Sequence, residues 1–156
     1  MTYELTIGVR PAQTTAVMDG TVSAAGIEAW LAAAYGRVER VLAAQGLHAG
    51  GPPFARYHVL GRDRVHIEAG FPVGTWVDPD AGVHASRLPG GPVVTTMHAG
   101  SPARVSTAHE LLSKWVYGHE GTVDEDAWEV YLTDPANTPD PVSWRTEIVQ
   151  PYRTVT

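Results

Sequence analysis

The sequence has no cysteine and only a single lysine. The absence of cysteine excludes disulfides, thiolate metal sites and cysteine nucleophiles together. The other ten basic residues are arginines scattered between Arg10 and Arg153, so no basic stripe could neutralise a nucleic-acid backbone. No apolar run approaches the roughly 18 residues of a transmembrane helix, and the first residues lack the regions of a signal peptide. We therefore expect a cytoplasmic protein without direct nucleic-acid or membrane contacts.

The residues that are present suffice for a globular core. The chain has 156 residues, of which 44% are hydrophobic. A chain of this length buries roughly two thirds of the surface that its unfolded form exposes. Its 17 acidic and 11 basic residues give a formal charge of −6, which mildly favours cationic ligands through long-range attraction.

Internal repetition is the most informative feature of the sequence. Three landmarks recur at an offset of 79 residues: Met18 and Met97, Glu68 and Glu147, and Pro72 and Pro151. A shared offset at separate landmarks indicates two halves with the same plan.

The segments between these landmarks follow the same order in both halves. Apolar residues recur at helical spacing in 27–42 and again in 108–119. The expected helix ends are Ser23 and Gly46 for the first helix, and Ser101 with Pro102 and either Gly118 or Gly121 for the second. The β-prone runs are 4–10, 13–19, 54–60 and 65–73 in the first half, and 83–88, 92–98, 127–133 and 145–152 in the second.

This order predicts an α+β fold of two pseudo-symmetric βαββ repeats, with antiparallel sheets around a central ligand cleft. A single unit of this kind leaves one sheet face exposed, and pairing the units buries it. We expect one domain over 1–156, made of repeat 1 (about 1–73) and repeat 2 (about 83–156) joined by a connector at 74–82.

The predicted strands carry aromatic and acidic side chains. Alternation places Glu129 and Tyr131 on one face, about 7 Å apart along the strand, and the last strand carries Glu147. The comparable positions of the first half hold Tyr57, His58, Glu68 and Phe71. If the halves pack about a pseudo-twofold axis, these strands flank a shared cleft. Aromatic walls with a carboxylate suit a lipophilic cation.

The segments 128–135 (Trp-Glu-Val-Tyr-Leu-Thr-Asp-Pro) and 146–152 (Thr-Glu-Ile-Val-Gln-Pro-Tyr) resemble the C-terminal signature of GyrI-like domains. Segments 55–58 and 67–73 echo it in the first half, and the resemblance covers nearly the whole chain. It implies a SOUL-like fold of two βαββ repeats around a ligand cleft, as in the effector-binding domains of multidrug-responsive regulators. It also implies that Glu129 is the cleft glutamate that meets cationic aromatic ligands, with Tyr131 beside it. Tyr152 departs from the signature, which often has valine there.

We therefore predict a free-standing domain that binds lipophilic, cationic or aromatic small molecules, for sequestration or sensing. Glu129 is the expected charge partner. The other candidate contacts are the aromatic walls Tyr131, Tyr57, Phe71 and Trp115, the carboxylates Glu147 and Glu68, and His58. The helical spacing of Trp115 is more typical of a core position than of a pocket. The chain has no room for a helix-turn-helix, so DNA recognition would need a regulator partner chain; a homodimer also stays open.

Two other functions stay open at this point. A hydrolase of aromatic or cyclopropane-bearing toxins, as in a subgroup of the GyrI-like family, would transfer a proton through Glu129 or Glu147, with Tyr131 or Tyr57 donating to a carbonyl oxygen. A protein-interaction module acting on DNA gyrase would instead need an exposed apolar patch. The seven histidines lack metal-ligand spacing, and His109-Glu110 has no second histidine at the zinc-protease distance. We expect neither a metal nor a cofactor.

Overall fold

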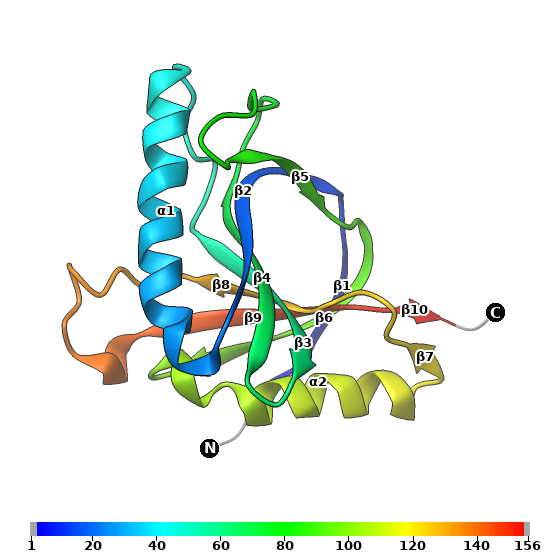
Figure 1. Cartoon of the computed structure of the whole chain (residues 1–156). Coiled ribbons are helices and arrows are strands. Elements are labelled where there is room, and N and C mark those ends of the chain that lie inside the picture. Colours follow the sequence, from blue (N-terminus) through cyan, green and yellow to red (C-terminus); the bar gives the residue numbers. More distant parts are fainter. Residues whose placement is uncertain (1–2, 155–156) are drawn as a thin grey trace. The chain divides into compact units, whose positions relative to one another are not determined.

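The computed structural model describes residues 3–154, which divide into two compact units. Residues 12–89 form one unit, and the segments 3–11 and 90–154 together form the other. Each unit is an antiparallel sheet of four strands with one α-helix packed on it (Figure 1). The α+β class predicted from the sequence is confirmed.

The unit 12–89 contains the first helix. Its strands are β2 (Gln13–Val22), β3 (Phe54–Gly61), β4 (Arg64–Pro72) and β5 (His84–Leu88), in the spatial order β5-β2-β4-β3. Helix α1 (Ile27–Ala44) follows a 3₁₀ turn at Ala24–Gly26 and packs on β2 and β4. Its buried positions lie three or four residues apart, as an amphipathic helix requires: Ala34, Val38, Val41 and Leu42. They form a core with Ala16 and Phe71 from the sheet.

The other unit contains the second helix. Its strands are β1 (Thr6–Arg10), β6 (Gly91–Ala99), β8 (Trp128–Tyr131) and β9 (Arg145–Pro151), in the order β1-β6-β9-β8. A separate ribbon pairs β7 (Gly121–Thr122) with β10 (Arg153–Thr154). Helix α2 (Ser106–Gly118) lies against β6 and β9 and packs Ala108, Leu112 and Val116 onto Val94 and Ile148. Further 3₁₀ turns lie at Pro102–Arg104 and Pro141–Ser143.

The two βαββ units agree in detail. α1 begins at Ile27 and α2 at Ser106, while β4 ends at Pro72 and β9 at Pro151, and both pairs keep the offset of 79 residues. The first strand of each βαββ repeat pairs with the second strand of the other repeat: β1 pairs with β6, and β5 pairs with β2. The compact units therefore differ from the repeats 1–73 and 83–156, whose division of the chain stays a sequence prediction.

The helix ends match the sequence in part. Ser101 caps the turn before α2 by accepting from the amide of Ala103 at 3.2 Å, as expected. Gly46 ends α1 in a left-handed conformation (φ +70°), as expected. Ser23 precedes α1 without making a side-chain cap, and Asp63 accepts from the amide of Ala24 instead.

The second helix differs from the sequence prediction at its end. α2 does stop at Gly118, but neither Gly118 nor Gly121 has a positive φ. Glu120 takes the left-handed position after it, at φ +61°. Among the described residues, no helix is both long and apolar enough to cross a membrane.

Candidate functional site

A buried carboxylate lies between strand β8 and helix α2. Glu129 is only 5% exposed. The hydroxyl of Tyr131 donates to its Oε1 at 2.9 Å, and Nε2 of His109 lies 2.8 Å from its Oε2. The prediction that Glu129 and Tyr131 share one face of the strand is confirmed, and His109 joins them from the helix.

The register of β8 on β9 and the position of His109 on α2 bring together the trio of Glu129, Tyr131 and His109. In the β8–β9 pairing Glu129 lies opposite Ile148, whose side chain is buried beneath α2. Cross-strand partners share a face of a sheet, so Glu129 also points to the helix side. His109 follows the buried Ala108 on the first turn of α2, so its ring reaches the sheet beside the core stripe and keeps 28% of its side chain exposed.

The trio leaves the carboxylate with acceptor capacity. An ionised carboxylate offers about four lone-pair sites, and the hydrogen bonds from His109 and Tyr131 occupy two of them. Because a carboxylate only accepts, Nε2 of His109 carries the hydrogen in this contact. Tyr131 donates without carrying a charge, and His109 balances the buried charge only when its ring is protonated; a buried charge without a counter-ion is costly.

Glu147 lies on the opposite face of the same sheet. Its partner across the β8–β9 pairing is Val130, which alternates with Glu129 along β8. Arg10 of β1 holds both of its oxygens, at 3.1 and 3.0 Å. The structure thus places Glu147 on the other face of the sheet from Glu129, the alternative carboxylate for a hydrolytic site, and from Tyr131.

The candidates of the first half lie in the unit 12–89. Glu68 accepts from the hydroxyl of Ser86 at 3.0 Å and meets the guanidinium of Arg56 at 3.5 Å. Tyr57 and His58 are consecutive in β3, so their side chains point to opposite faces.

The two remaining aromatic candidates pack within their own units. Phe71 belongs to the core under α1, where Tyr35 meets its ring edge-on at 5.7 Å, and it lines a hollow of about 410 Å³. Trp115 packs against the core under α2 and stacks on His119 at 4.2 Å. Tyr152, the departure from the family signature, meets Trp115 edge-on at 5.5 Å. Their role as ligand walls stays a prediction.

His109 is the site residue that the sequence did not reveal. Its only sequence context was the incomplete zinc-protease spacing, and the contact with Glu129 joins positions 20 residues apart in different elements. No local pattern encodes such a contact. Among residues 3–154, no group of three or more histidine, aspartate or glutamate side chains could hold a metal ion.

Comparison with known proteins identifies the fold. No family model and no curated protein sequence matches the chain. The C-terminal domain of EcmrR superposes with a TM-score of 0.83 at 20% identity, covering 99% of this chain and all of that one. SAV2435, solved with bound tetraphenylphosphonium, gives 0.65 at 15% identity, covering 96% and 94% of the two chains. A hydrolase from Listeria innocua gives 0.66 at 13% identity, covering 96% and 91%. The chain therefore shares the fold of these three proteins, in agreement with the fold that the resemblance of its sequence implied.

Proposed function

We propose that this protein binds lipophilic cations and that Glu129 is the counter-charge. The observation that carries the proposal is the buried carboxylate of Glu129, whose hydrogen-bond donors His109 and Tyr131 need not carry a charge. A cation that reaches it gains an electrostatic partner in a place from which water is largely excluded. The ring of Tyr131 adds an aromatic surface, which attracts positive charge.

His109 offers the way in. Its ring is the more exposed member of the pair, with 28% of the side chain accessible against 6% for Glu129. A ligand that displaces this ring reaches Oε2 directly, so binding exchanges one hydrogen bond for an ion pair. Under this proposal His109 covers the carboxylate when no ligand is bound.

Proteins of the same fold support the ligand class. SAV2435 was solved with tetraphenylphosphonium, a lipophilic cation with four aromatic rings. Of the predicted aromatic walls besides Tyr131, Trp115 lies in the same unit as Glu129. Sequestration or sensing of such ligands is the role we assign to the domain.

A fluorescence titration with a lipophilic cationic dye tests the charge of the site. Glu129→Gln keeps the size of the side chain and removes its charge. We expect at least tenfold weaker binding, about 1.4 kcal/mol. Glu110→Gln is the matched control, because it removes an exposed carboxylate next to His109 on the same helix and should leave the affinity unchanged.

Competition experiments distinguish the contribution of the ligand's charge from that of its hydrophobicity. Tetraphenylphosphonium should displace the dye from the parent protein, whereas uncharged triphenylphosphine oxide should displace it at least tenfold less well. Equal competition by the two compounds, or equal dye affinity for Glu129→Gln and the parent, would refute the proposal.

Hydrolysis is the second candidate, favoured by the hydrogen-bonded chain from His109 through Glu129 to Tyr131. A carboxylate with a histidine and a tyrosine on its two oxygens has the groups that proton transfer to a leaving group or from a water requires. The hydrolase from Listeria innocua shares the fold. Mass spectrometry of aromatic esters and cyclopropane-bearing alkylators after incubation tests this candidate. Hydrolysed product from the parent but not from Glu129→Gln would support it, and recovery of unchanged compound in both would rule it out for those substrates.

A further inference from the structure

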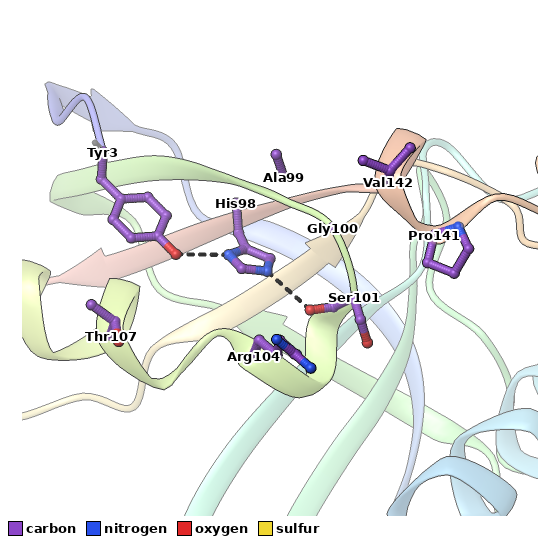
Figure 2. Close-up of a pocket in the computed structure, with 9 residues that line it drawn as sticks. All are labelled: Tyr3, His98, Ala99, Gly100, Ser101, Arg104, Thr107, Pro141 and Val142. Atoms are coloured by element: carbon purple, nitrogen blue, oxygen red, sulfur yellow. Dashed lines mark hydrogen bonds between the residues drawn. The ribbon is translucent and has the colours of Figure 1, made fainter. Parts of the chain in front are cut away.

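A second cavity opens beside the start of α2, in the unit formed by 3–11 and 90–154. Its volume is about 710 Å³, within the range of small-molecule sites. Figure 2 shows its lining, which comes from the N-terminal segment, the end of β6, the first turn of α2 and the turn at Pro141–Ser143. Glu129 is not among the lining residues.

One wall of this cavity is fixed by His98, which is 3% exposed. Its Nε2 lies 2.9 Å from the carbonyl oxygen of Ser101, which can only accept, so Nε2 carries a hydrogen. The hydroxyl of Tyr3 lies 2.8 Å from Nδ1 and stands as donor to it in the neutral ring (Figure 2). The rings of Tyr3 and His98 also stack, with centroids 6.0 Å apart. The wall is therefore organised before any ligand arrives.

The donors at the cavity are not used within the described chain. Arg104 has no ion pair or side-chain hydrogen bond to any residue in 3–154, and neither does the hydroxyl of Thr107. Ser101 Oγ accepts from the amide of Ala103, so its own hydroxyl hydrogen remains available. None of the lining residues is acidic. A positive guanidinium with two hydroxyl donors and no carboxylate suits an anion.

The rest of the lining is apolar. Pro141 and Val142 face the cavity from the turn, and Val142 is 70% exposed. The ring of Tyr3 and the methyl group of Ala99 continue this surface. A ligand that places an anionic group at Arg104 can thus bury an apolar body against Val142.

We infer that this cavity binds a small amphipathic anion, with a carboxylate, sulfonate or phosphate at Arg104 and an apolar body against Tyr3, Pro141 and Val142. The preferred charge is opposite to that proposed for the Glu129 site. The overall charge of −6 does not oppose this locally, because exposed charges further apart than about 10 Å are screened at 0.1 M salt.

The test uses 1-naphthoate as the probe and 1-naphthamide as its uncharged counterpart. Binding is followed by amide shifts in two-dimensional NMR spectra of the intact protein. We expect 1-naphthoate to shift the amides of Gly100, Ser101 and Thr107, and 1-naphthamide to bind at least about fivefold more weakly. Equal affinity for the two compounds, or shifts confined to other parts of the chain, would overturn the inference.

Arginine substitutions test which guanidinium binds the anionic group of the probe. Arg104→Gln should weaken 1-naphthoate about fivefold or more, about 1 kcal/mol. Arg62→Gln, in the exposed turn between β3 and β4 of the other unit, is the matched control and should have no effect. If both variants weakened the binding of 1-naphthoate equally, the effect would come from the net charge of the protein. The assignment of Arg104 would then be overturned. Glu129→Gln should leave 1-naphthoate binding unchanged, which separates this inference from the proposed cation site.

Discussion

The hydroxyl of Tyr131 is the donor to Oε1 of Glu129, at 2.9 Å. Tyr131→Phe keeps the ring and removes this donor. A hydrogen bond to a charged group contributes about 1.5–3 kcal/mol, and water replaces it poorly at a carboxylate that is 5% exposed. We therefore expect the free energy of unfolding to fall by about 1.5–3 kcal/mol. For a chain of this size, that is a decrease in Tm of about 3–12 °C.

Urea unfolding, followed by circular dichroism and tryptophan fluorescence, measures this loss. Tyr117→Phe is the matched control, because Tyr117 is exposed on α2 and its hydroxyl makes no hydrogen bond to another side chain or backbone group in 3–154. It should change stability by less than about 0.5 kcal/mol. In a Glu129→Gln background the loss from Tyr131→Phe should shrink to about 1 kcal/mol, the contribution of an uncharged hydrogen bond. The reasoning is refuted if Tyr131→Phe costs no more than the control, or costs the same in both backgrounds.

Three further predictions concern the scaffold, and thermal unfolding measures each. Gly70→Ala should cost at least about 2 kcal/mol, because a Cβ there overlaps the backbone carbonyl of Ala16 on the neighbouring strand; Gly8→Ala, which meets open space, should change stability by less than about 0.5 kcal/mol. Gly46→Ala should cost about 1 kcal/mol, since φ is +70° at the end of α1; an unchanged Tm would contradict the left-handed assignment. Arg10→Gln breaks the bidentate ion pair with Glu147. It should lower the free energy of unfolding by about 1 kcal/mol or less, because the two side chains are 40% and 23% exposed. The difference in stability between Arg10→Gln and the parent protein should shrink in 1 M NaCl, where the Debye length is about 3 Å. A difference that grows with salt would contradict an ionic origin.

Local patterns in the sequence were sufficient for most of the fold. The period of two in 127–133 correctly placed Glu129 and Tyr131 on one face, because side chains alternate along any strand. The helical spacing around Val38 and Leu112 correctly identified both core stripes. The recurrence of landmarks at 79 residues matched the starts of both helices, since both halves fold by the same local rules.

The rest depended on contacts between distant segments. Alternation shows which residues of one strand share a face, but it does not show how two strands are aligned. The placement of Glu147 with Arg10, away from Glu129, follows from the β8–β9 and β1–β6 pairings and was therefore not predictable. The same holds for the cap at Asp63 and for the contact of His109 with Glu129, both of which join different elements.

The register of β8 on β9 determines which residues lie together at the proposed cation site. A slip by one residue would turn every side chain of β8 to the other face. Glu129 would then leave His109 and lie on the face of Glu147, so that two carboxylates would share the one guanidinium of Arg10. Trp128, which is buried opposite Val149 in the observed register, would lose that partner. Repulsion between like charges and lost apolar burial both act against the slip. The residues that would bind a cation thus also help to select the strand alignment that brings them together.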